Sequence, residues 1–150
     1  MENKKYELTN ETINFNGVTL YRIQAVKDFD DVKKGDLGGY IEKERNLSHE
    51  GSCWVYGRAV VSDNAEVSEN AIVDDNAAVS GNAQVDGNAW VSGNAEVDGK
   101  AKISGNAVIS GNAWVAGRTV ISGNARVSSN AWVSGKGWLA QIGRNPPNSL

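Results

Sequence analysis

The chain has 150 residues, a formal net charge of −3 and a single cysteine, Cys53, which leaves room for one domain with a small annex. Cys53 has no second cysteine with which to form an internal disulfide, so a reducing setting inside a cell is expected. No apolar stretch reaches the length that a membrane-spanning segment needs. These features exclude a disulfide framework and predict a cytoplasmic protein.

Residues 1–46 predict a small β cap. The Asn16-Gly17 pair between two β-prone runs is a strong hairpin signal. A polar connector follows, and residues 37–41 are expected to begin the stacking of the next segment. The β-prone runs of the cap are residues 6–9, 12–15 and 18–25. Such a cap covers an end of the fold that would otherwise expose an unpaired β edge.

From residue 53 to residue 139 a six-residue phrase close to V-S-G-N-A-x recurs without insertion or deletion. In each A-x-V segment the Ala and the Val point to one side of a short strand and the residue between them points to the other. The S-G-N segment is typical of a corner, because Gly and Asn tolerate a positive φ. A hexapeptide period is the signature of a parallel β-helix. Residues 47–140 are therefore predicted to form about five triangular coils.

The phrase G-N-A-x-V-S resembles the left-handed β-helix hexapeptide repeat of acyltransferases and of their non-enzymatic relatives. The left hand is what this resemblance implies, because ordinary crossover rules favour the right hand. Residues 28–56, D-F-x-D-V-K-K-G-D-L-G-G-Y-I-E-K-E-x-N-L-S-x-E-G-x-C-W-V-Y, resemble the N-terminal region of hexapeptide-repeat proteins carried by bacteriophages and prophages. The resemblance implies a homotrimer packed side by side in the cytoplasm of a bacterial host.

The outward residues of the coils fall on three faces, and one face carries a column of large apolar side chains. Its members are Trp54, Ile72, Trp90 and Val108, followed by Arg126. Because such a column is too large to leave in water, it predicts the subunit interface. The alternative is that tryptophans act as stacking platforms for a base or a ring. The tryptophans favoured for stacking are Trp114, Trp132 and Trp138.

The second half of the repeat region is basic. At one corner Asn is replaced by a cation in three successive coils, at Lys100, Arg118 and Lys136. Clustered cations attract anions such as phosphates. The predicted binding residues are Lys100, Lys102, Arg118, Arg126 and Lys136 for charge, with the three tryptophans above for stacking. The alternative is that these charges prevent end-to-end aggregation of an open β edge.

The single histidine, His49, lies in a corner that has two extra residues. Hexapeptide acyltransferases generally use a histidine as general base, so the resemblance assigns that role to His49 if the chain is an enzyme. One histidine cannot supply the three ligands of the zinc-dependent carbonic anhydrases with this fold. No metal and no cofactor are therefore expected.

Together these features predict a non-catalytic phage or prophage protein that captures an anionic, nucleotide-like or phosphorylated small molecule between subunits, and so sequesters a host defence signal. Neither a membrane nor a long nucleic acid is expected among its partners. An acyltransferase-like enzyme and a structural trimeric spacer are the alternatives. The tail, residues 141–150, has lost the period and is expected to cap the last coil or to reach a neighbouring subunit.

Overall fold

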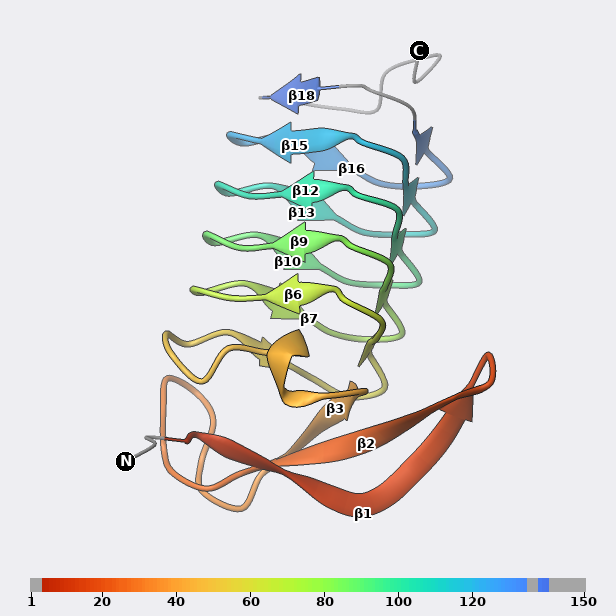
Figure 1. Cartoon of the computed structure of the whole chain (residues 1–150). Helices are drawn as coiled ribbons and strands as arrows, with labels where there is room; N and C mark the ends of the chain where they lie inside the picture. Colours follow the sequence, from red (N-terminus) through yellow and green to blue (C-terminus); the bar gives the residue numbers. More distant parts are fainter. Residues whose placement is uncertain (1–3, 135–137, 141–150) are drawn as a thin grey trace.

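Three parallel β-sheets form the sides of a prism in the computed structural model, which describes residues 4–134 and 138–140 (Figure 1). The coils lie one above another, and a hairpin crosses the lower end of the stack. Within the described residues the only helix is the 3-10 helix η1 (Glu44–Asn46). The predicted all-β fold, a parallel β-solenoid of about five coils, is confirmed.

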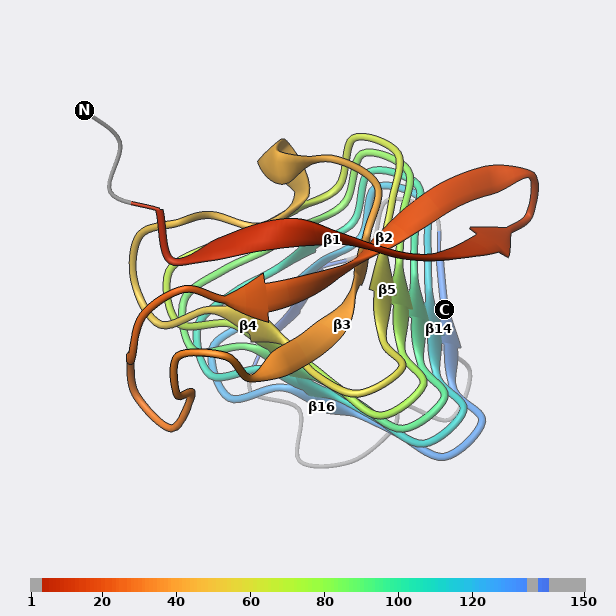
Figure 2. The ribbon, with the colours of Figure 1, turned by 90° about the horizontal axis from the view of Figure 1, so that it is seen from below.

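The cap begins with β1 (Tyr6–Phe15) and β2 (Val18–Ala25), which pair as an antiparallel hairpin. Asn16 and Gly17 form the predicted turn, with φ angles of 54° and 85°. A register shift between Leu8 and Thr12 joins the two predicted runs into one strand. Seen from below, the hairpin crosses the end of the triangular stack (Figure 2).

The third strand, β3 (Leu37–Ile41), connects the cap to the solenoid. It pairs antiparallel with β2 and parallel with β5, where Tyr40 lies opposite Val60. One continuous sheet, here called the long sheet, therefore runs from the hairpin to the last coil. Its further strands are β5 (Val60–Val61), β8 (Ala78–Val79), β11 (Glu96–Val97), β14 (Trp114–Val115) and β17 (Trp132–Val133).

The other two sides of the prism are named after their first strands. The β4 sheet contains β4 (Trp54–Val55), β7 (Ile72–Val73), β10 (Trp90–Val91), β13 (Val108–Ile109) and β16 (Arg126–Val127). The β6 sheet contains β6 (Glu66–Val67), β9 (Gln84–Val85), β12 (Lys102–Ile103), β15 (Val120–Ser122) and β18 (Trp138–Ala140). Each residue of a solenoid strand pairs with the residue one full coil further along the chain, as Trp90 does with Val108.

The inward Ala and Val or Ile residues of the repeat form the core, and most of them are completely buried. The corners are close-packed as well. At Gly99, where φ is 67°, an added Cβ would lie 2.6 Å from the backbone nitrogen of Gly117 in the next coil. Corner asparagines donate to one another between coils, as Asn88 does to Asn106 over 3.3 Å. The repeat therefore fixes the backbone spacing through small residues at the corners.

The predicted division between residues 46 and 47 falls where η1 ends and the β6 sheet begins, since Leu47 forms a parallel bridge with Val67. Because this corner has two extra residues, Leu47 lies eight residues before Val55 instead of the six that separate later aliphatic positions. The tail, residues 141–150, and Lys136 lie outside the described residues. Among the described residues there is no helix long and apolar enough to cross a membrane.

Candidate functional site

A pocket of about 660 Å³ opens in the cap, where the start of β1 meets η1 and the corner insertion. Its lining combines the single histidine with acidic and basic side chains. The lining residues are Lys4, Lys5, Lys27, Asp28, Phe29, Glu44, His49, Glu50 and Gly51. The two extra residues of the corner place His49 in this pocket, off the regular path of the coils. We call this hollow the cap pocket.

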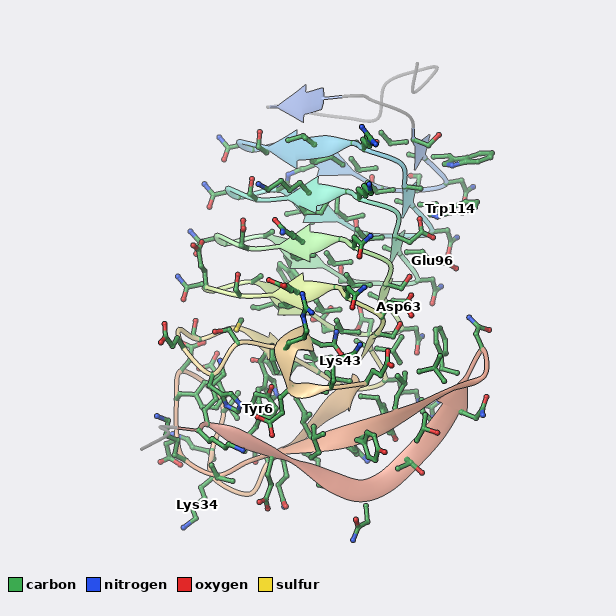
Figure 3. The ribbon with its side chains drawn as sticks, in the orientation of Figure 1. Tyr6, Lys34, Lys43, Asp63, Glu96 and Trp114 are labelled. Atoms are coloured by element: carbon green, nitrogen blue, oxygen red, sulfur yellow. The ribbon has the colours of Figure 1, made fainter. Side chains whose placement is uncertain are left out.

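The His49 ring is held on three sides. Its Nδ1 accepts a hydrogen bond from the Lys5 backbone N–H over 3.2 Å, so the proton of the neutral ring lies on Nε2. Nε2 then donates to Glu44 Oε1 over 3.0 Å. The ring also stacks on Tyr6, with centroids 4.1 Å apart. The hydroxyl of Tyr6, near the lower left of Figure 3, donates to the Leu47 carbonyl over 2.6 Å.

Glu44 connects the histidine to the basic side of the cap pocket. Its Oε2 accepts a hydrogen bond from Lys4 Nζ over 3.1 Å. The hydrogen bond from His49 is the largest cause that lowers the pKa of the Glu44 carboxyl, and Lys4 adds to it while burial opposes both. Glu44 therefore remains an anion beside the imidazole, which is the arrangement that stabilises an imidazolium.

Lys5 and Cys53 form a buried pair behind the histidine. Lys5 is only 1% exposed, and its Nζ donates to the Cys53 carbonyl over 2.6 Å and to the Gly51 carbonyl over 3.1 Å. Its Nζ also lies 3.4 Å from Cys53 Sγ and 4.7 Å from the centre of the Phe29 ring. Burial lowers the pKa of Lys5 and raises the pKa of the Cys53 thiol. This pair ties the first strand to the first coil.

The predicted anion-binding residues do not all come together in one chain. Lys100 and Arg118 lie one coil apart at the corner between the long sheet and the β6 sheet, and Lys102 follows on the β6 sheet. Arg126 lies on the β4 sheet, a different face. Lys136 is outside the described residues.

The predicted stacking tryptophans are also divided between faces. Trp114 and Trp132 stack on the long sheet, with ring centroids 5.0 Å apart and planes 5° from parallel. Trp138 belongs to β18 of the β6 sheet. Two of the three therefore form one aromatic surface within a single chain.

A diagonal contact between coils was missed by the sequence reasoning. Trp114 Nε1 donates to Asp98 Oδ2 over 3.3 Å, across 16 positions of sequence. Trp90 lies at the same offset from Asp74, where burial raises the pKa of the carboxyl and Trp90 lowers it. The signal was present in the sequence, because an Asp replaces the corner Ser one diagonal step below each of these tryptophans.

Lys102 lies at the same offset from a third aspartate, and the two charges interact. Asp86 replaces the corner Ser 16 positions before Lys102. Burial raises the pKa of the Asp86 carboxyl, Glu69 raises it further and the charge of Lys102 lowers it. Part of the positive charge predicted to attract a ligand therefore already meets a carboxylate of the same chain.

The predicted subunit interface needs one correction. Trp54 is only 1% exposed, because the cap covers it: Phe29 and Tyr6 meet its ring edge-on with centroids 5.2 and 6.1 Å away. Trp54 therefore belongs to the core and cannot contribute to an outer interface. Of the other predicted members, Trp90 is 45% exposed, and Ile72 and Val108 are half-buried on the same face. The homotrimer itself stays a prediction.

Within residues 4–134 and 138–140, no three or more His, Cys, Asp or Glu side chains lie together so that they could hold a metal ion. The ionisable groups that the cap pocket offers are one imidazole, three carboxylates and three lysines.

Comparison with known proteins gives two similarities. A family model described as the YdcK β-solenoid repeat matches residues 101–117 and 121–135. A protein of Escherichia coli (strain K12) named "Uncharacterized acetyltransferase YdcK" is 36% identical over 80 residues, which cover 43% of this chain and 24% of that protein. The chain thus matches about a quarter of the length of this relative. Both similarities fit a hexapeptide-type β-solenoid. The name of the relative points to an enzyme, so the prediction of a non-catalytic protein is wrong.

Proposed function

We propose that the chain supports acyl transfer from a coenzyme A thioester, with His49 of the cap pocket as the general base. The observation that carries the proposal is the hydrogen bond between His49 Nε2 and the Glu44 carboxylate. A carboxylate that orients an imidazole and stabilises its protonated form is the arrangement used by general-base histidines. The similarity to a protein named as an acetyltransferase supports the same reaction class.

The tautomer of His49 determines which ring nitrogen acts as the base. Nε2 carries the proton and donates it in the hydrogen bond to Glu44. Nδ1 is therefore the nitrogen that accepts the proton of the acceptor hydroxyl or amine. The Lys5 backbone N–H occupies Nδ1 in the resting structure over 3.2 Å, and the acceptor displaces this hydrogen bond when it binds. The acceptor oxygen or nitrogen then attacks the thioester carbonyl, the bond to sulfur breaks, and the leaving thiolate takes the proton from the imidazolium.

The cap pocket contains lysines that can pair with the phosphates of an anionic donor, and it also contains the carboxylates of Asp28, Glu44 and Glu50. Lys4 and Lys27 line the opening of the cap pocket beside His49, and cations on a concave surface raise the local concentration of phosphate-bearing molecules. The anionic, nucleotide-like ligand predicted from the sequence is compatible with such a donor. The phage setting, the homotrimer and the sequestration of a host signal rest on the sequence resemblance alone and remain predictions.

The test is the release of free coenzyme A from acetyl-coenzyme A in the presence of a panel of small amines and alcohols. His49→Gln should lower turnover at least about 100-fold, as expected for loss of a general base. Glu44→Gln should lower it less, because the amide can still orient the ring. Gln84→Ala, an exposed position on the β6 sheet, serves as the matched control and should leave turnover unchanged.

Two results would contradict the proposal. One is the absence of turnover by the wild-type protein with every acceptor of the panel. The other is turnover that survives His49→Gln in protein whose thermal unfolding matches that of the wild type. The unfolding measurement is needed because His49 also contacts Lys5 and Tyr6 of the first strand.

A further inference from the structure

The long sheet carries an aromatic surface that the acyl-transfer proposal does not use. Trp114 and Trp132 are 39% and 57% exposed and stack on each other. Glu96 pairs with Trp114 in the register of the sheet, one coil closer to the cap. In Figure 3, Trp114 and Glu96 are seen on the same side of the prism, with Glu96 in the coil below. An indole and a carboxylate thus stand next to each other on one face.

A hollow of about 200 Å³ lies between these two coils. It is lined by Asn94, Glu96, Asn112, Ala113 and Trp114. Asn94 Nδ2 donates to Asn112 Oδ1 over 3.2 Å, which closes the corner side of the hollow. Since Trp132 covers one face of the Trp114 ring, the opposite face is the one turned towards the Glu96 coil. We call this hollow the Trp114–Glu96 site.

The charges around the site favour a cation. The face of an indole ring carries negative potential and attracts cations more strongly than other aromatic rings do. The hydrogen bond from Trp114 Nε1 to Asp98 Oδ2 increases this potential, because it polarises the ring. Glu96 is exposed and forms no ion pair with any residue that the structure describes. A ring face and an unpaired carboxylate therefore border the same small hollow.

The chemistry of the lining also selects the kind of cation. A hard metal ion requires six or more oxygen ligands around it, whereas this hollow offers one carboxylate, amide groups and an aromatic face. An alkylated ammonium group matches better, because its apolar methyl groups contact the ring while its charge meets Glu96. The small volume admits the head group and leaves the rest of the molecule in solvent.

We propose that the Trp114–Glu96 site binds the alkylated ammonium group of a small free organic cation, for which choline is the representative. This site is distinct from the cap pocket and does not depend on acyl transfer. It also gives Trp114 a different ligand from the anion predicted from the sequence, because Trp114 lies beside the carboxylates of Glu96 and Asp98.

The chain contains a matched comparison at Trp90. Trp90 is exposed and lies on the same diagonal from Asp74, where burial raises the pKa of the carboxyl and Trp90 lowers it. The residue one coil below its ring is Ile72 instead of a glutamate, and the adjacent hollow is lined by Arg58 together with Asp74 and Asp75. This place has the ring without a carboxylate at the paired position beneath it, and Arg58 opposes its two aspartates, so it should bind the same cation more weakly.

The experiment is a titration of the protein with choline, followed through the indole N–H signals in NMR spectra. The neutral isostere 3,3-dimethylbutan-1-ol, which has the same shape without the charge, is titrated in parallel. Choline should shift the Trp114 signal saturably at millimolar concentrations, and the isostere should not. Trp114→Leu should abolish binding. Glu96→Gln should raise the dissociation constant about fivefold, which corresponds to the loss of one charge–charge contact at an exposed site.

Two control variants locate the effect. Trp90→Leu and Glu66→Gln remove an exposed tryptophan and an outward glutamate from other faces, and both should leave the dissociation constant unchanged. The proposal is overturned if choline gives no saturable shift, if the neutral isostere binds equally well, or if Glu96→Gln has no effect. Folding of each variant is checked by the dispersion of its remaining amide signals.

Discussion

The cap and the solenoid use the same residue type in opposite ways. Asn46 in the cap is fully buried, and its side chain forms four hydrogen bonds to the backbone. Asn88 in the solenoid is an exposed corner residue whose side chain donates to the next asparagine of a ladder. In the solenoid, the position of an asparagine in the repeat determines its role, and the asparagines at the same corner of neighbouring coils have the same role. In the cap a single side chain holds several segments together.

The same difference applies to charged and aromatic groups. The cap buries Lys5 and Tyr6 against specific carbonyl groups, and it holds His49 between a carboxylate and a backbone amide. On the coils, charged residues such as Glu96 and Lys102 lie on the exposed surface. Chemistry that needs a fixed geometry is therefore concentrated in the irregular part of the chain, while the regular part offers repeated surfaces.

The largest expected effect comes from exchanging the two asparagines for alanine. Asn46→Ala should lower the free energy of unfolding by about 3 kcal/mol, because it removes four side-chain hydrogen bonds to the backbone and leaves the buried Ala65 carbonyl without that donor. Asn88→Ala removes one exposed hydrogen bond and should cost less than about 1 kcal/mol. Urea denaturation monitored by circular dichroism measures both. Equal losses for the two variants would contradict the distinction between cap and solenoid.

Replacing a positive-φ glycine by alanine should have the opposite pattern. The loss of stability should be larger in the solenoid than in the cap. At Gly99 the new Cβ would lie 2.6 Å from the Gly117 backbone nitrogen, whereas at Gly17 no atom lies within 4 Å. At both positions the alanine is destabilised by about 1–2 kcal/mol because its backbone must adopt the left-handed conformation. Gly99→Ala should cost at least about 1 kcal/mol more, because stacked backbones must separate.

The measurement is the shift of the thermal unfolding midpoint of Gly99→Ala relative to that of Gly17→Ala. A smaller shift for Gly99→Ala would mean that the coils adjust their spacing easily. That result would also weaken the structural basis for treating the repeat as a rigid support for the Trp114–Glu96 site.

Most of the fold could be predicted from the sequence because the repeat has a strict period. The inward Ala and Val positions and the Asn16-Gly17 hairpin follow from local chemistry, and the structure places them as expected. The burial of Trp54 could not be predicted in this way. Its position in the period assigns it to the outer surface, and only the tertiary contact with the cap covers it.

The candidate site was predictable only in part. His49 was identified as the single histidine, but its partners Glu44, Lys5 and Tyr6 come from segments whose contacts follow no period. The proximity of Asp74 to Trp90 and of Asp98 to Trp114 could have been predicted from the sequence. Each Asp replaces a corner Ser 16 positions before the tryptophan. Arg126 was grouped with Lys100 because both lie in the basic second half of the repeat, although the eighteen-residue period places Arg126 on the face of Trp90.

The smallest expected effect concerns pH, and it distinguishes one carboxylate of the cap from one of the solenoid. The pKa of Glu44 is lowered, mainly by the hydrogen bond from His49. The stabilising effect of the Glu44 carboxylate is therefore complete above its ordinary pKa of 4.5 and is lost as the pH falls through the lowered pKa.

The pKa of Asp74, on the solenoid, is raised by burial, and its Oδ1 is buried without a hydrogen-bond partner among the described residues. Ionisation of Asp74 therefore destabilises the fold as the pH rises above its ordinary value of 3.8.

Glu44→Gln should consequently reduce stability at pH 7, and its difference from the wild type should shrink towards pH 3. Asp74→Asn should change stability little at pH 3 and increase it at pH 7, because the amide carries no charge that burial opposes. Thermal unfolding midpoints of both variants and of the wild type between pH 3 and pH 7 measure the two slopes. The exposed Glu96→Gln serves as the control for loss of a negative charge. The slope compared is the change with pH of each variant's unfolding midpoint relative to the wild type. The same sign for Glu44→Gln and Asp74→Asn would show that net charge, and not the local surroundings of each carboxylate, determines the pH dependence.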